Sequence, residues 1–166
     1  MNEFLILYIL KKQPTSMYEI QQFINKHFNL YVKISVGTIA PVLKKLEAAN
    51  LIEAEKKISN GGQRKHIFKI TGEGQIIFHN LIVMPISGNP QSSQKEINIL
   101  SLIITDSIFS NEEQKLLAKK IICALNNQLI LIKNHIQAFN RDIEYLKICC
   151  EETEKKINYY KNTFIE

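Results

Sequence analysis

Residues 91–166 contain neither glycine nor proline. Glycine and proline are the two residues that most often interrupt helices, because glycine is too flexible and proline lacks a backbone donor. We therefore predict that these 76 residues are almost entirely helical. A first helix is expected over 95–109. Ser110 and Glu113 have the spacing of a capping box, which predicts that a second, much longer helix begins there.

Apolar residues recur along this second helix, first in steps of four and then in alternating steps of four and three. The alternating steps average 3.5 residues, which is the repeat of a coiled coil. About 50 helical residues would extend for roughly 75 Å, which is too long for one small domain to bury. We therefore predict that a second copy of the chain covers the apolar stripe. The residues assigned to dimerisation are Leu117, Ile121, Ile132, Ile136, Phe139, Ile143, Leu146, Ile157 and Tyr160.

The composition is that of a globular protein, with 45% hydrophobic and 22% charged residues among 166. It excludes disorder over most of the chain. No apolar run approaches the roughly 20 residues of a membrane span, and the first residues lack the features of a secretory signal. We therefore expect a cytoplasmic protein that has no membrane partner. The three cysteines form no CxxC pair, which predicts free thiols.

The positive charge lies in the first half of the chain. Residues 1–83 carry eleven basic and six acidic side chains, whereas residues 84–166 carry ten of each. The whole net charge of +5 therefore belongs to the first half. Such asymmetry favours a polyanion as the partner of that half, and nucleic acid is the obvious candidate. A solvated basic face is the alternative.

The first half is predicted to form three helices, a hairpin and a fourth helix. The first helix is expected over 2–12, and the second over 17–28 with a capping box at Ser16 and Glu19. The third is expected to begin at Ser35 and to be followed by Asn50 in a left-handed conformation. Thr71 is expected to cap the fourth. Alternating patterns over 53–59 and 64–70 flank Asn60-Gly61, a strong hairpin signal. Ile58, His66, Phe68 and Ile70 are expected to face inward.

This order of elements is typical of a winged helix-turn-helix, in which the third helix enters the major groove and the hairpin, or wing, contacts phosphates. The candidate DNA-binding residues are Ser35, Thr38, Lys44 and Lys45 on the third helix and Asn60, Gln63, Arg64 and Lys65 on the wing. Alternatives remain open for several of them. Ser35 is equally explained as a helix cap, and Lys44 and Lys45 as a solvated face.

Several segments in the same order resemble the PadR family of transcriptional regulators. They are Tyr18-Glu19-Ile20, the eleven residues GTIAPVLKKLE from Gly37 to Glu47, Leu51-Ile52, and the fourteen residues GGQRKHIFKITGEG from Gly61 to Gly74. The resemblance covers roughly residues 3–80, and Tyr18 joins the DNA-binding candidates. It implies a winged helix-turn-helix followed by a helical dimerisation region.

The sequence departs from the family pattern at three positions. The family usually has a tyrosine where Ala40 stands, a glycine where Asn50 stands and a glycine where Met17 stands. None of these changes is expected to break the fold. The tyrosine commonly faces DNA, so one expected contact is absent at Ala40.

We therefore predict a mainly α fold with a small β-hairpin wing. A winged helix-turn-helix DNA-binding domain is expected over 1–83, a linker over 84–94 and a long-helix, coiled-coil dimerisation domain over 95–166. The predicted function is that of a homodimeric repressor that binds an inverted-repeat operator in double-stranded DNA. One alternative is a protein-interaction module whose long helix binds a partner while the winged domain is structural. Another is a non-specific or centromere-type DNA-binding protein.

Other kinds of site find little support. Four scattered histidines have no metal-ligand spacing, and the sequence has no catalytic or nucleotide-binding motif, so we expect no metal, no cofactor and no enzyme activity. Cys149 and Cys150 read as small hydrophobic residues, with a redox sensor as the alternative. A small-molecule effector of unknown identity is left open. The aromatic residues Phe4, Tyr8, Phe109 and Phe139 could line its pocket, although core packing explains them better.

Overall fold

The computed structural model describes residues 1–58, 64–86 and 88–164, with the side chains of Arg64, Thr163 and Phe164 left aside. The chain divides into two compact units, Met1–Ala124 and Leu125–Glu166. Each unit is described by itself below. The first contains every strand and the first five helices, and the second consists of the greater part of the last helix.

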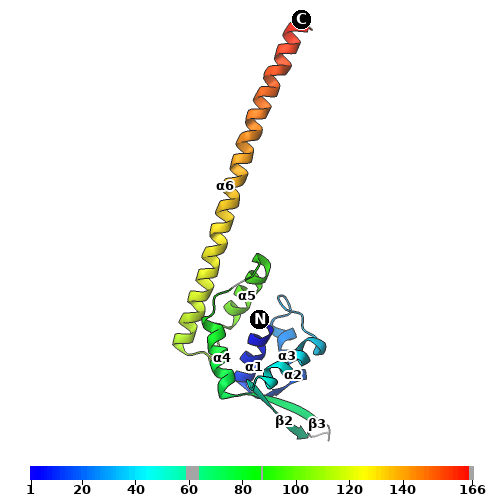
Figure 1. Cartoon of the computed structure of the whole chain (residues 1–166), viewed down its shortest axis with the longest axis vertical. Helices are drawn as coiled ribbons and strands as arrows, with labels where there is room; N and C mark the ends of the chain where they lie inside the picture. The colour runs from blue at the N-terminus through cyan, green and yellow to red at the C-terminus, as the bar shows by residue number, and fades with distance from the viewer. Residues whose placement is uncertain (59–63, 87, 165–166) are drawn as a thin grey trace. The chain divides into compact units, whose positions relative to one another are not determined.

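Helix α1 (Asn2–Lys12) forms the centre of the first unit, with α2 (Met17–His27), α3 (Val36–Ala48) and α4 (Gly72–Val83) around it (Figure 1). Every residue of α1 from Phe4 to Leu10 is buried, so the helix is covered on all sides. This agrees with its sequence, which is apolar nearly all round. Phe4 stacks on Phe78 of α4, and the ring centroids are 5.1 Å apart.

Three antiparallel strands form a small sheet in the order β1-β3-β2. The predicted hairpin is confirmed as β2 (Ile52–Ile58) and β3 (Arg64–Ile70), which pair from Ile52 with Ile70 to Ile58 with Arg64. Strand β1 (Thr15–Ser16) pairs with Ile67 and Phe68 of β3 and was not predicted. The short strand ties the base of the hairpin to the start of α2.

The expected inward face of the hairpin is partly wrong. Phe68 and Ile70 are buried as predicted, but Ile58 is 74% exposed and His66 is also exposed. The reason is that helices and β1 cover only the base of the sheet, so the outer half of each strand has no core beneath it. Ile67, on the opposite face, is buried at the base where β1 pairs with β3.

The predicted helix caps are confirmed. Ser16 and Glu19 form the capping box of α2, and Ser35 and Thr71 cap α3 and α4. Asn50 has a φ of 56°, the left-handed conformation expected after α3. The Leu51 N–H then donates to the carbonyl of Leu46 at 2.9 Å, which closes a Schellman motif.

Helix α5 spans Pro90–Ile103, so both ends of the predicted 95–109 helix are wrong. Asn89 caps α5 by accepting a hydrogen bond from the Ser92 N–H at 2.9 Å, and Pro90 occupies the first turn. A proline is well tolerated there because its missing donor would have no partner in any case. The last five residues of the expected linker are therefore helical.

Helix α6 spans Asn111–Phe164 and begins where predicted. The Ser110 N–H donates to Glu113 at 2.8 Å and the Glu113 N–H donates to Ser110 at 3.2 Å. In the first unit Leu117 and Ile121 are buried in the core of their own chain. We therefore correct the prediction for these two residues, which are core residues and not dimerisation residues.

Ion pairs and a hydrogen bond join α1 to the turn after α5 and to the first part of α6. Asp106 accepts a hydrogen bond from the Tyr8 hydroxyl at 2.6 Å and pairs with Lys12, while Lys11 pairs with Glu113 at 3.1 Å. Burial and the hydrogen bond to Asp106 raise the pKa of Tyr8. Burial would raise the pKa of Asp106 as well, but the hydrogen bonds from Lys12 and Tyr8 outweigh it, so that pKa is lowered.

Lys120 of α6 is a second polar link in this unit. Its side chain is only 7% exposed, and its ammonium group lies 3.1 Å from Glu96 of α5 and donates to the carbonyl of Leu81 at 2.9 Å. One buried cation thus connects α4, α5 and α6.

The described helices include none that is both long enough and apolar enough to cross a membrane.

Candidate nucleic-acid interface

The first turn of α3 lies open to solvent. Ser35, Val36, Gly37 and Thr38 are all exposed, whereas Ile39 on the opposite face is fully buried. The Ser35 hydroxyl accepts a hydrogen bond from the Thr38 N–H at 3.3 Å and lies 3.1 Å from the Thr38 hydroxyl. Ser35 is therefore a helix cap, and its exposure leaves both hydroxyls accessible to a ligand at the helix N-terminus.

Two amide side chains of α2 hold the segment that leads into α3. Asn25 donates to the carbonyl of Ile34 at 3.2 Å and accepts from the Ile34 N–H at 3.4 Å. Gln21 donates to the same carbonyl at 3.4 Å. Because Ile34 immediately precedes Ser35, these bonds fix where α3 begins. The roles of Asn25 and Gln21 are not predictable from the sequence, because a polar side chain within an amphipathic helix gives little local signal of such a role.

A shallow hollow of about 380 Å³ lies beside this N-terminus. It is lined by Asn25, Asn29, Lys33, Ile34, Ser35 and Thr38. The hollow combines hydroxyls, amides and one cation at the positive end of a helix, which is a chemistry suited to phosphate.

The two lysines predicted on α3 differ in their surroundings. Lys45 pairs with Glu3 of α1 at 2.6 Å, so its charge is already matched within the chain. Lys44 is exposed, and within the described residues no carboxylate lies within ion-pair distance of it. Lys44 is therefore the freer of the two cations.

Glu19 links α2 to the wing. One of its carboxylate oxygens accepts hydrogen bonds from the Ser16 N–H at 2.8 Å, the Ser16 hydroxyl at 2.7 Å and the Thr15 hydroxyl at 2.9 Å. The other lies 3.4 Å from the ammonium group of Lys65 on β3. These hydrogen bonds, first that from the Ser16 backbone, lower the pKa of Glu19 to about 2. The predicted wing cation Lys65 is thus held against α2.

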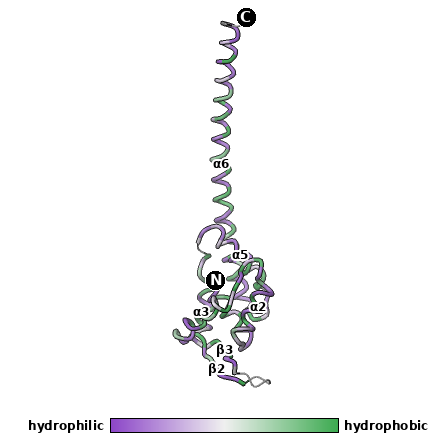
Figure 2. The backbone as a smooth tube through the Cα atoms, turned by 90° about the vertical axis from the view of Figure 1, so that its right-hand side faces the viewer, coloured by the Kyte–Doolittle hydropathy of each residue, from purple (hydrophilic) through white to green (hydrophobic). Residues whose placement is uncertain are grey.

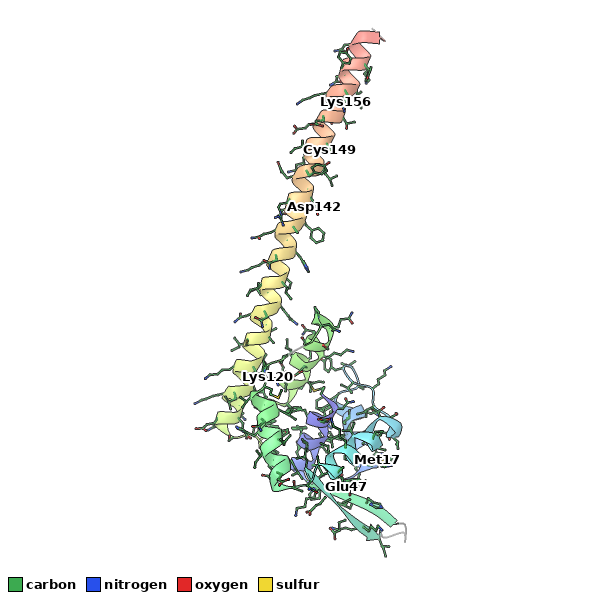
Figure 3. The ribbon with its side chains drawn as sticks, viewed as in Figure 1. Met17, Glu47, Lys120, Asp142, Cys149 and Lys156 are labelled. Carbon is green, nitrogen blue, oxygen red and sulfur yellow. The ribbon has the colours of Figure 1, made fainter. Side chains whose placement is uncertain are left out.

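Tyr18 is 61% exposed at the start of α2. It lies beside a hollow of about 500 Å³ whose lining comes from α2 and β3 and includes Met17, Lys65, His66 and Phe68. Figure 3 labels Met17 in this part of the molecule. The structure therefore brings Tyr18 and Lys65, which are 47 positions apart in the sequence, to one hollow.

Charged side chains of both signs line the flanks of the hairpin. Lys69 lies 3.6 Å from Glu53 across the two strands, and Lys57 lies 3.4 Å from Glu55 along β2. Lys56 is exposed on the other face of β2. The predicted contacts Asn60 and Gln63 lie outside the described residues, and of Arg64 the backbone alone is described.

No group of three or more potential ligands for a metal ion occurs in residues 1–58, 64–86 and 88–164. Of the aromatic residues considered for an effector pocket, Phe4, Tyr8 and Phe109 are buried in the core of the first unit, where Tyr8 stacks on Phe109. Phe139, in the second unit, is 65% exposed.

The comparisons with known proteins agree with this arrangement. The model of the transcriptional regulator PadR-like family matches residues 6–80. Residues 6–80 form a PadR-like domain. The match runs from within α1 to within α4 and includes the whole described part of the wing, close to the 3–80 of the resemblance. The members of that family are described as transcriptional regulators.

Solved structures of PadR proteins are similar to the chain. A PadR family regulator from Clostridium difficile R20291 has 22% identity and a TM-score of 0.44, covering 65% of this chain and 98% of that chain. A PadR-like transcription factor from Bacteroides fragilis has 25% identity and a TM-score of 0.43, with 62% and 88% covered. Bacillus subtilis PadR, solved with operator DNA, has 18% identity and a TM-score of 0.49, with 79% and 95% covered. A search of curated proteins finds no significant match.

Proposed function

We propose that the protein is a homodimeric, sequence-specific repressor that binds an inverted-repeat operator through the PadR-like domain. Helix α3 would enter the major groove, and the wing would contact phosphates beside it. The observation that carries the proposal is the exposed, capped first turn of α3, which Asn25 holds in place within a PadR-like domain. Repression would follow from occlusion of the promoter by the bound dimer.

Three exposed side chains support this geometry. Thr38 lies in the first turn of α3, where side chains reach base edges, and Lys33 lines the phosphate-sized hollow beside it. Lys44 lies farther along the same helix, and no carboxylate among the described residues pairs with its charge. A genomic operator as partner also agrees with the cytoplasmic location expected from the sequence.

Dimerisation is part of the proposal. An inverted repeat presents two equivalent half-sites, so two copies of the domain read it together. The residues that would join the copies lie on α6 beyond Leu125 and are the predicted set without Leu117 and Ile121. An effector would act by changing the spacing of the two recognition helices, which need to move only slightly between the two states.

The test of the DNA interface is the dependence of affinity on salt. Each phosphate that a cation neutralises contributes close to one to the slope of log affinity against log salt. We expect Arg64→Ala with Lys65→Ala to lower the slope by about one to two, since Glu19 partly matches the charge of Lys65, and to weaken binding evenly across sequences. Lys155→Ala with Lys156→Ala removes the same charge from α6 and should leave the slope unchanged. Equal slopes for all three proteins would contradict the role of the wing.

A second candidate function is a protein-interaction module. The observation that favours it is the apolar surface of the second unit, where Leu125, Phe139 and Leu146 are each at least 45% exposed. Under this reading the wild-type protein would have negligible DNA affinity before any substitution.

A further inference from the structure

The second unit presents an apolar stripe along α6 that nothing in its own chain covers within that unit. The side chains of the stripe are between 45% and 65% exposed: Leu125, Leu129, Ile132, Ile136, Phe139, Ile143, Leu146 and Ile157. Figure 2 shows hydrophobic residues recurring between hydrophilic ones along this helix. So long a row of exposed apolar residues is typical of an interaction surface.

The stripe has the two alternating core positions of a coiled coil, called a and d. Position a is taken by Leu129, Ile136, Ile143, Cys150 and Ile157, and position d by Leu125, Ile132, Phe139, Leu146 and Thr153. The flanking positions e and g decide which helix can lie opposite. Charged or titratable side chains at e include Lys133, Lys147 and Glu154, and those at g include His135, Asp142 and Lys156. Figure 3 labels Asp142, Cys149 and Lys156, three successive g positions of α6.

Two copies of α6 in a parallel, in-register pair would gain no net stability from these charges. In that arrangement each g residue faces the e residue five positions later in the partner. Asp142 would then face a lysine at 147, which is favourable. Lys156 would face a lysine at 161, which is equally unfavourable. The two effects cancel.

One antiparallel register brings opposite charges together and leaves no like charges facing each other. In an antiparallel pair of helices, e positions face e positions and g positions face g positions. Within one register, the numbers of two facing residues therefore add up to the same total at every e position, and to another fixed total at every g position. In this register Lys133 faces Glu154 of the partner subunit, and His135 faces Asp142 of the partner subunit. By symmetry each of these pairs occurs twice. No like charges face each other at e or g over residues 125–157.

Shifting the register by one heptad in either direction removes this match. One shift brings Lys133 opposite a lysine at 147. The other places Lys147 opposite its own copy and Asp142 opposite its own copy. Like charges in such positions destabilise a pair. The charge pattern of the helix therefore selects one antiparallel register among the neighbouring ones.

We propose that residues 125–157 of α6 pair antiparallel with the same segment of a second copy, with Lys133 facing Glu154 and Ile143 packing on Phe139 of the partner subunit. This rests on the homodimer of the proposed function and adds its orientation and register. The pairing places Cys150 against Ile132 of the partner subunit. The two copies of Cys150 are then 18 residues apart along the helix pair, or about 27 Å, so they cannot form a disulfide.

Oxidative cross-linking of the full-length protein tests the register. In a background with Cys123→Ser, Cys149→Ser and Cys150→Ser, the pair Lys133→Cys with Glu154→Cys should cross-link two chains under copper–phenanthroline. The matched control is Lys133→Cys with Lys147→Cys, which face each other only in the shifted register, and it should not cross-link. Cross-linking of the control, or of native Cys150 in the wild-type protein, would overturn the proposal.

Sedimentation of the same variants separates two kinds of failure. A dimer in which Lys133→Cys with Glu154→Cys fails to cross-link would overturn the register while leaving the homodimer intact. A monomer at micromolar concentration would overturn both the register and the homodimer, whatever the DNA affinity proves to be.

Charge reversal provides a second measurement without cysteines. Lys133→Glu alone and Glu154→Lys alone should each weaken dimerisation by about tenfold, since each reversal creates two repulsive pairs. The double variant should restore the wild-type affinity. Additive weakening in the double variant would show that the two residues do not face each other, as in a parallel pair.

Discussion

Glu19 and Lys65 join the start of α2 to the wing strand β3 across a distance of 3.4 Å. The same carboxylate caps α2, so one side chain fixes both the helix that supports α3 and the strand that leads to the tip of the wing. Under the proposed function, α3 and the wing would both contact DNA, so this link would hold the two contacting elements in position relative to each other.

The lowered pKa of Glu19 makes this link sensitive to acid. Its pKa is about 2 in the folded chain against 4.5 as its ordinary value, so the folded state binds the proton less tightly. Its contribution to stability is therefore complete above pH 4.5 and is lost as the pH falls towards 2. Because the side chain is nearly half exposed, we expect Glu19→Gln to cost only about 1 kcal/mol at pH 7.

Urea unfolding at pH 7, 4 and 2.5 checks this. The stabilities of wild type and Glu19→Gln should converge as the pH falls. Glu144→Gln, which removes the same charge from α6, should follow the wild type at each pH. A constant gap between wild type and Glu19→Gln across the three pH values would contradict the assignment.

Asn25 should matter for both stability and DNA affinity, since it pairs with both backbone groups of Ile34. Asn25→Ala should lower the free energy of unfolding by about 1–2 kcal/mol, because the Ile34 N–H loses its partner and the Ile34 carbonyl keeps only the longer bond from Gln21. It should weaken DNA binding further, because the start of α3 is no longer fixed. The control is Gln22→Ala, which removes an exposed amide from the same helix outside the hollow and should change neither quantity. Thermal unfolding and fluorescence anisotropy with labelled DNA measure both, and equal effects of the two variants would refute the role.

The two glycines of the first turn of α4 should respond differently to alanine. A Cβ at Gly74 would lie 2.0 Å from the carbonyl oxygen of Leu51, whereas a Cβ at Gly72 would meet nothing within 4 Å. We expect Gly74→Ala to destabilise the protein by about 2–4 kcal/mol, since backbone must move. Gly72→Ala should be neutral or stabilising by up to about 1 kcal/mol. Denaturant midpoints of the two variants decide the matter, and similar values would show that α4 does not approach Leu51 so closely.

Two adjacent lysines of α6 should also respond differently to substitution. Lys120 is buried and bound to Glu96 and to the carbonyl of Leu81, whereas Lys119 is exposed. Lys120→Met should cost about 2–3 kcal/mol, because it leaves a half-buried carboxylate and a carbonyl without their donor. Lys119→Met should cost less than about 0.5 kcal/mol. If calorimetry gave both variants the stability of the wild type, the polar link between α4, α5 and α6 would contribute nothing.

Local chemistry made much of this fold predictable. Helix starts at Ser16, Ser35, Thr71 and Ser110 follow from a short-range rule in which a side chain bonds to a backbone group three residues on. The turn at Asn50 follows from the tolerance of asparagine for positive φ. The hairpin followed from its turn sequence and from the alternation of its strands.

Features that depend on contacts between distant parts of the sequence could not be predicted from such local rules. Strand β1 has only two residues, too few to show any alternation. Lys45 looked like a free cation because its partner Glu3 lies 42 positions earlier. The apolar residues recur in unbroken steps of four from Leu117 to Leu125, yet the first is buried in its own chain and the second is exposed. Periodicity reveals that an apolar stripe is covered, but not whether the cover belongs to the same chain.

Every part of the proposed function depends on recognition of a specific DNA sequence by the PadR-like domain. A gel shift with DNA from immediately upstream of the protein's own gene, at about physiological salt and against a scrambled competitor, tests it most directly. We expect a discrete complex that survives excess scrambled competitor and disappears with unlabelled upstream DNA. A smear that both competitors remove equally would contradict it, since binding would then depend on charge alone.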